Sequence, residues 1–304
     1  MNYIGSKKTL KDWIFDIIES KAKGCETFCD LFAGSCEITK EAKRKGYKVT
    51  SNDLQYYSYI LANYFLENNI EIEIPTVKPI RGNITKLYAE QSKYFTKENA
   101  ELCDGYIEEI KRTNNIPLLA CLIMAMDKIA NTASVYAAYL KKYKQTALKQ
   151  LEIKQEIIQG KAGKAYNEKA EELIKKIEGD ILYLDPPYNS RQYSSNYHVL
   201  ETIAKMDLPE VHGKTLLRND CQSSQFSSKL KASKALEELI SNAKFKYIFM
   251  SYNDEGILSF EEIKSIFEKY GSYEIKAKKY KKFNSGSGID RDSVFEFLHI
   301  LTKK

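Results

Sequence analysis

Two kinds of hydrophobic pattern alternate along the first fifth of the chain. Between residues 10 and 18 the apolar positions recur at spacings of one and three, which is typical of one face of an amphipathic helix. Short apolar runs follow at residues 27–32 and 48–52, separated by a small-residue turn, a helical stretch and Gly46. This order of strand, turn, helix and strand predicts the start of a doubly wound sheet.

Further elements follow from the same patterns. The pattern of residues 54–66 predicts a helix. A β-branched stretch at residues 70–79 predicts a third strand. Residues 118–140 are predicted to form a long apolar helix. Near-continuous apolar runs at residues 181–184 and 245–250 predict buried parallel strands, because both faces of such strands are covered.

The pattern divides the chain into two expected parts. Residues 273–280 and 294–301 flank a Ser/Gly loop, which predicts a closing antiparallel hairpin. The Lys- and Glu-rich segment 88–178 is predicted to be an inserted, mainly helical subdomain. We therefore expect an α/β protein, in which residues 1–87 and 179–304 form one Rossmann-like mixed sheet.

Length and composition fit a globular protein with one large domain or two modest ones. The chain has 304 residues, of which 43% are hydrophobic and 29% charged. Asp127, Lys128 and Asn131 interrupt the longest apolar stretch, so no membrane-spanning helix is expected. The first residues have no apolar core of a secretory signal, which favours a cytoplasmic protein.

The cysteines and the charges say less about binding sites and partners. The six cysteines include no CxxC pair and the three histidines are distant from Cys25, Cys29 and Cys36, so we expect free thiols and no metal site. A net charge of +6 only weakly favours a polyanionic partner. Two basic segments, residues 211–235 and 275–285, form either solvated faces or contacts to phosphates.

Candidate binding residues follow the predicted strands. Ligands bind at the carboxyl ends of the strands in an open α/β sheet, and small residues at 30–35 let the backbone approach a ligand. Asp53 follows Gly34 at a distance of nineteen positions, the spacing of an acid that meets ribose hydroxyls, but it is equally a good N-cap. Asn83 can bind an adenine edge or simply form a turn. Together these residues favour an adenosine-containing cofactor.

The strand at residues 181–184 ends in the most specific motif of the chain, Asp185-Pro186-Pro187-Tyr188. The two prolines stiffen the loop. A carboxylate and a backbone carbonyl can accept both hydrogens of an exocyclic amine such as adenine N6, and the tyrosine ring can stack on an extruded base. The motif therefore predicts chemistry on a base amine, with an ordinary proline-rich turn as the alternative.

The order of the motifs resembles that of the Dam-type DNA adenine-N6 methyltransferases. The similar segments are NYIGSK, DLFAGS, SND, GN and DPPY. Residues 185–201 are similar to methyltransferases of type II restriction–modification systems, and segments 130–136 and 251–253 extend the similarity over nearly the whole chain. The resemblance implies S-adenosylmethionine as cofactor, double-stranded DNA as substrate and a cognate restriction endonuclease as partner. It is compatible with a monomer or a weak dimer.

The resemblance also implies roles for individual residues. Asp185 and Tyr188 match the catalytic pair, with Pro186 and Pro187 between them. The residues expected at the cofactor are Tyr3, Lys7, Asp30, Phe32, Gly34, Asp53, Asn83 and Asp185. The residues expected to contact DNA are Arg191, Tyr193, Asn196, Tyr197, His198, Lys214, Arg218, Lys279 and Lys281, although a lone residue such as His198 is more often structural.

Two positions depart from the family pattern. Gly34-Ser35-Cys36 stands where the family usually has Gly-x-Gly, so Cys36 must adopt a backbone geometry normally given to glycine. Asn83 stands where many members have an aspartate at the cofactor adenine. We expect a slightly altered loop and retained cofactor binding.

The resemblance implies direct, in-line methyl transfer in which Asp185 accepts a hydrogen bond and orients the amine.

Other substrates of the same motif are RNA adenine, cytosine N4 and a glutamine side chain. An aspartate at the head of the motif disfavours the last two. A catalytically silent DNA-binding subunit is the alternative from another class. Residues 88–178 are the candidate target-recognition region, or are simply structural.

Overall fold

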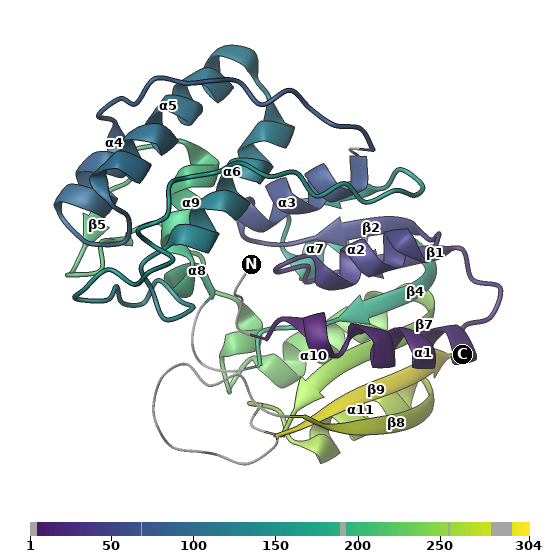
Figure 1. The fold of residues 1–304 in the computed structure, drawn as a ribbon. Coiled ribbons are helices and arrows are strands. Elements are labelled where there is room, and N and C mark those ends of the chain that lie inside the picture. The colour runs from purple at the N-terminus through teal and green to yellow at the C-terminus, as the bar shows by residue number, and fades with distance from the viewer. Residues whose placement is uncertain (1–4, 68, 189–192, 255, 281–293) are drawn as a thin grey trace.

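A seven-stranded sheet forms the centre of the computed structural model (Figure 1). The structure describes residues 5–67, 69–188, 193–254, 256–280 and 294–304. In spatial order the strands are β3 (Lys164–Tyr166), β2 (Lys48–Asn52), β1 (Thr27–Asp30), β4 (Glu178–Leu184), β7 (Lys244–Asn253), β9 (Val294–Lys303) and β8 (Gly271–Tyr280). Neighbouring strands from β3 to β7 are parallel, and β9 is antiparallel to both of its neighbours. The predicted Rossmann-like mixed sheet with a closing hairpin is confirmed.

Helices cover both faces of the sheet, which explains why its central strands are apolar throughout. The helices on one face are α1 (Lys11–Lys21) and α2 (Glu37–Arg44). Those on the other face are α7 (Ala170–Leu173), α10 (Ala232–Asn242) and α11 (Phe260–Tyr270). Ile181 and Tyr183 of β4 pack on the first face, whereas Leu182 and Leu184 pack on the second.

A second group of helices lies to one side of the sheet and shares one hydrophobic core (Figure 1). Its longer members are α3 (Tyr56–Glu67), α5 (Lys97–Thr113), α6 (Ile116–Ile129) and α9 (His198–Lys205). Its shorter members are α4 (Asn83–Thr85), the π-helix η2 (Lys86–Glu90) and α8 (Tyr193–Asn196). The remaining short elements are the 3₁₀ turns η1 (Lys7–Thr9) and η3 (Gln225–Ser227) and the hairpin of β5 (Val211–His212) and β6 (Leu217–Arg218).

The helical group is built from more of the chain than the expected insertion. Both α3 and α9 lie outside residues 88–178, and they pack against α6 and against each other. Conversely, β3 lies inside residues 88–178 and pairs with β2 in the central sheet. The segment predicted as a mainly helical insertion therefore contributes an edge strand to the sheet as well as two long helices.

The third parallel strand is not where the sequence predicted it. Residues 70–79, all of which are described, form no strand. Pro75 and Pro79 lack the N–H groups that a ladder needs, and β3 pairs with β2 instead.

The apolar helix predicted at residues 118–140 is shorter than expected. Helix α6 ends at Ile129, and Ala130 has extended backbone. Asn131 then fixes a turn, because its side-chain amide donates to the backbone oxygens of Lys93 and Leu140 at 2.9 and 3.0 Å. An asparagine that bonds the backbone competes with helix continuation. None of the helices in the described chain is long and apolar enough to cross a membrane.

Candidate active site

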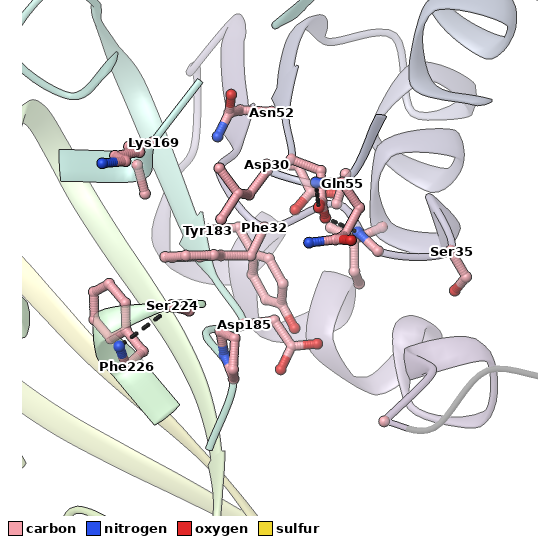
Figure 2. Close-up of a pocket in the computed structure, with 18 of the residues that line it drawn as sticks. Asp30, Phe32, Ser35, Asn52, Gln55, Lys169, Tyr183, Asp185, Ser224 and Phe226 are labelled. Carbon is pink, nitrogen blue, oxygen red and sulfur yellow. Dashed lines mark hydrogen bonds between the residues drawn. The ribbon is translucent and has the colours of Figure 1, made fainter. Parts of the chain in front are cut away.

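A cavity opens at the carboxyl edge of the sheet, where β1, β2 and β4 end (Figure 2). Its volume is about 1110 Å³, part of which is open solvent. The sequence-predicted residues that line it are Lys7, Asp30, Phe32, Gly34, Asp53, Asp185 and Pro187. Most of the predicted cofactor residues and part of the predicted catalytic motif therefore meet in one place, although they come from three separate parts of the chain.

Asp30 ends β1 and is only 1% exposed. One carboxylate oxygen, Oδ2, accepts a hydrogen bond of 2.7 Å from the hydroxyl of Thr39, which in turn lies 2.9 Å from the hydroxyl of Ser51. The other oxygen, Oδ1, is buried and has no hydrogen-bond partner among the described residues. Burial raises the pKa of Asp30 to about 7, against the opposing effect of the Thr39 bond. The free oxygen can accept a bond from a donor in the cavity.

The loop after β1 turns through left-handed backbone. Gly34 has φ 49° and Cys36 has φ 61° with ψ 21°, so the prediction that Cys36 adopts a glycine-like geometry is confirmed. Cys36 is fully buried at the start of α2. The strained residue keeps the loop closely folded against the cavity.

Asp53 follows β2 and holds this loop in place. Its Oδ2 accepts from the backbone N–H of Gly34 and its Oδ1 from the backbone N–H of Gln55, both at 2.8 Å. Burial raises the pKa of Asp53 to about 6, while these two bonds lower it. The carboxylate therefore links the glycine loop to the beginning of α3 and also lines the cavity.

Lys7 connects the beginning of the chain to the predicted catalytic loop. Its ammonium donates to Asp185 Oδ1 at 2.8 Å and to the backbone oxygen of Gly5 at 3.1 Å, and it lies 3.4 Å from Glu296 Oε1. Burial alone lowers the pKa of Lys7, but the two carboxylates outweigh it and raise the pKa well above its usual value. Burial raises the pKa of Asp185, and the charge of Lys7 opposes that rise.

Sequence reasoning missed Glu296. It lies on β9, is 1% exposed and comes from the opposite end of the chain to Lys7. A single acid within the apolar run of β9 is the signal that could have identified it, because an unpaired charge is costly in a buried strand.

Tyr188 packs beside the cavity and does not line it. The side chain is 9% exposed, and its ring meets the ring of Tyr252 edge-on at a centroid distance of 6.0 Å. The Lys7 ammonium lies 5.7 Å from the Tyr188 ring centroid. The backbone oxygen of Tyr188 accepts from Ile257 at 2.9 Å. Strand β7 and the segment after it thus position the end of the predicted motif.

Asn83 was predicted at the cofactor, but the structure does not bring it to the cavity. Its amide donates to the backbone oxygen of Asp207 at 3.3 Å. Because β3 replaces the predicted third strand, the residues that follow β3 line the cavity instead. They are Glu168, Lys169, Ala170 and Glu171.

Several predicted DNA contacts are buried, and the structure gives them other partners. Tyr197 lies between the rings of Tyr57 and Tyr136, at centroid distances of 5.9 and 6.3 Å. The imidazole of His198 contacts the backbone oxygens of Ser195 and Thr215 at 3.0 and 2.8 Å. These contacts give the two side chains structural roles, because they are not exposed to a DNA backbone.

Asn196 and Arg218 are also buried, contrary to the expectation of DNA contact. Arg218 is 2% exposed and makes two bonds of 2.7 Å to Asp207 and two of 2.8 Å to Asp220. Its guanidinium is thus occupied by two carboxylates within the fold, which leaves no face for a phosphate.

The other predicted DNA contacts are either exposed or not fully described by the structure. Lys214, in the turn between β5 and β6, and Lys279, on β8, are exposed. Arg191 and Lys281 lie outside the described residues, and so does Tyr3, which was predicted at the cofactor. Tyr193 begins α8, but its side chain is not described.

A loop that carries no recognised motif lines the cavity beside the residues that follow β1 (Figure 2). Phe226 meets Phe32 edge-on at 5.2 Å between ring centroids. The Ser224 hydroxyl accepts from the backbone N–H of Phe226 at 3.3 Å and begins η3. The two aromatic rings give the cavity an apolar wall, next to the polar ends of β1 and β2.

Comparisons with known proteins identify the family and several relatives of this chain. The family model of D12 class N6 adenine-specific DNA methyltransferases matches residues 3–266. The type II methyltransferase M.NlaIII of Neisseria lactamica is 40% identical over 333 residues, covering 100% of this chain and 99% of that protein. The type II methyltransferase M.CviAII of Paramecium bursaria Chlorella virus 1 is 35% identical, covering 98% and 97%. The type II methyltransferase M.FokI of Planomicrobium okeanokoites is 38% identical, and this chain spans 53% of its length.

Proposed function

The chain belongs to the D12 class of N6 adenine-specific DNA methyltransferases, and we propose that it methylates a specific site in double-stranded DNA. The methyl donor is S-adenosylmethionine, and the target is the N6 amine of an adenine flipped out of the duplex. The observation that carries the proposal is that Asp30, which ends β1, and Asp185, which follows the neighbouring strand β4, line one cavity. The relatives named type II support a role as the modification half of a restriction–modification system with a cognate endonuclease.

The residues around the end of β1 suit the proposed cofactor. S-adenosylmethionine supplies a methyl group activated on a sulfonium. Asp30 Oδ1, buried and without a partner among the described residues, would accept from the ammonium of its methionine part. Asp53 would accept from its ribose hydroxyls through the remaining lone pairs, and the ring of Phe32 would pack against it.

Asp185 would orient the target amine. Among the described residues its hydrogen-bond partner is Lys7, which contacts Oδ1, so Oδ2 is open to one N6 hydrogen. The backbone oxygen of Pro186 would accept the other. Bound S-adenosylmethionine would supply the methyl group to the N6 lone pair, and Asp185 would accept the proton that N6 loses and pass it to water. Orientation of the amine in line with the methyl group carries much of the rate.

Contacts to DNA would come from exposed cations at the same edge of the sheet. Strand β8 is antiparallel to β9 and therefore parallel to β7, so Lys279 near its end lies at the edge where the cavity opens. Lys214 is exposed on the β5–β6 turn. Both would bind phosphates, which position the duplex without reading its sequence. Residues 88–178 remain the candidate for target recognition.

A methyl-transfer assay tests the proposal. Purified protein is given S-adenosylmethionine with a labelled methyl group and either unmethylated double-stranded DNA or RNA. Label should enter DNA, should not enter RNA, and should be lost with Asp185→Ala but kept with Asp12→Ala, which changes an exposed aspartate on α1. Label in RNA alone would favour an RNA adenine methyltransferase. Binding of the cofactor without transfer to either polymer would favour a silent DNA-binding subunit.

A further inference from the structure

A carboxylate from a distant part of the chain caps the start of helix α3. Glu201, on α9, accepts from the backbone N–H of Tyr56 at 3.2 Å with one oxygen and from that of Tyr57 at 3.1 Å with the other. These are the first two residues of α3. The N–H groups at a helix start have no partner within the helix, and a polar residue directly before the helix usually binds them. Here the segment that follows the catalytic motif binds them instead.

This distant cap leaves the aspartate before α3 available to the cavity. The carboxylate of Asp53 accepts from the backbone N–H groups of Gly34 and Gln55, and neither of these residues belongs to α3. An aspartate in this position commonly turns towards the helix and caps it. Because Glu201 already binds the N–H groups of Tyr56 and Tyr57, Asp53 can line the cavity.

The first turn of α3 also holds the glycine loop. The Ser58 hydroxyl donates to the backbone oxygen of Gly34 at 2.7 Å, and the N–H of Gly34 donates to Asp53 at 2.8 Å. A shift of the start of α3 would therefore move the glycine loop and Asp53 together. Glu201 itself does not line the cavity, so it acts on a ligand there through this turn.

Glu201 is fixed from its own side of the contact. It is buried, and its Oε1 lies 3.3 Å from the ammonium of Lys205, one turn further along α9. The rings of Tyr57 and Tyr197 meet beside it at a centroid distance of 5.9 Å. The cap is thus a rigid link between the segment after Asp185 and the start of α3.

We propose that Glu201 is a positioning residue for the cofactor, which caps α3 and thereby holds Asp53 in reach of the ribose hydroxyls. This inference rests on the proposed function. Glu201→Ala frees two N–H groups, and Asp53 is the polar side chain near enough to turn towards them. The affinity for S-adenosylhomocysteine, the cofactor without its methyl group, should fall about fivefold.

An analogue without ribose hydroxyls separates this role from a merely structural one. Calorimetry gives the affinities for S-adenosylhomocysteine and for its 2′,3′-dideoxy analogue. The unchanged protein should prefer the hydroxyl form by about tenfold, and Glu201→Ala should reduce the preference to about twofold. A general loosening of the fold would weaken both ligands equally and leave the preference unchanged.

Glu262→Ala is the matched control. Glu262 also accepts from a backbone N–H at a helix start, that of Ser259 before α11, at 2.7 Å, and it does not line the cavity. Its removal should lower stability without changing the preference for the hydroxyl form.

An unchanged preference in Glu201→Ala would overturn the inference, as would an equal reduction in Glu262→Ala. If Glu201→Ala does not fold, Glu201→Gln keeps one acceptor oxygen and must show an intermediate preference; an unchanged one would overturn the inference. An unchanged protein that binds S-adenosylhomocysteine but transfers no methyl to DNA would refute the proposed function instead.

Discussion

The ammonium of Lys7 donates to Asp185 at 2.8 Å across 178 positions of the chain. The segment around Lys7 and the proline-containing loop after β4, which are far apart in sequence, thereby meet at one site at the carboxyl edge of the sheet. Because the lysine is buried, its charge acts strongly on the carboxylate.

Removal of the Lys7 charge should shift the pH dependence of methyl transfer. The ammonium lowers the pKa of Asp185, which burial raises. Lys7→Gln should therefore raise this pKa, and the acid limb of kcat should move to higher pH. Steady-state rates of methyl transfer measured across the acid range would check this. An acid limb that stays in place would show that the ion pair has no part in the reaction.

Cofactor binding should depend on the protonation of Asp30. The pKa of this carboxyl is raised by burial to about 7. A cationic ammonium binds the carboxylate form, so the affinity for S-adenosylmethionine should fall as the pH decreases through 7. Calorimetric titrations at about one pH unit below and above that value would measure the change.

Asp30→Asn supplies the control for that titration. It should weaken binding about tenfold or more, because an amide cannot carry the negative charge that pairs with an ammonium. The remaining affinity should no longer depend on pH in this range. A variant that binds as tightly as the unchanged protein would remove Asp30 from the cofactor site.

The buried Arg218 should contribute to stability. Its guanidinium is 2% exposed and binds two carboxylates, which are themselves partly exposed. Arg218→Ala should lower the free energy of unfolding by about 2–3 kcal/mol, since it removes several charge-assisted bonds. Urea denaturation measures this. A loss below about 0.5 kcal/mol would show that the network is only a surface feature.

Lys279, unlike Arg218, should matter for DNA binding and not for stability. Because its side chain is exposed, Lys279→Ala should change stability by less than about 0.5 kcal/mol. It should weaken DNA binding and reduce the slope of log affinity against log salt by about 1, as expected for one lost phosphate contact. Binding titrations at several salt concentrations would check this, and an unchanged slope would exclude the contact.

Two substitutions of Cys36 should differ in their effect on stability, because the backbone of this residue is left-handed. Cys36→Gly relieves a backbone strain of about 1–3 kcal/mol and loses the packing of a small buried side chain, so the free energy of unfolding should change little. Cys36→Val adds a β-branched side chain at φ 61° and should destabilise by about 2 kcal/mol or more. Denaturant unfolding of both variants measures the difference. A valine variant as stable as the unchanged protein would contradict the account of the loop.

Local sequence order was sufficient to predict the residues at the ends of β1, β2 and β4. Asp30, Asp53 and Asp185 each follow a short apolar run, and parallel strands bring their carboxyl ends to one edge. The glycine-like backbone of Cys36 was predictable from the family resemblance, because Cys36 stands where the family usually has the second glycine of Gly-x-Gly.

The features that the sequence did not predict depend on contacts between distant segments of the chain. The β-branched stretch before Asn83 has strand-like composition, but nothing local showed that Lys164–Tyr166 would pair with β2 instead. Arg218 lies in a basic segment, and only the fold brings it to Asp207 and Asp220. Glu296 was missed because its partner is almost the whole chain away.

The most direct test of the account is the identity of the methylated nucleoside. DNA that has been methylated by the purified protein is digested to nucleosides and analysed by mass spectrometry. The account predicts N6-methyldeoxyadenosine with the unchanged protein and none with Asp185→Ala. N4-methyldeoxycytidine, or N6-methyldeoxyadenosine that persists in Asp185→Ala, would contradict it.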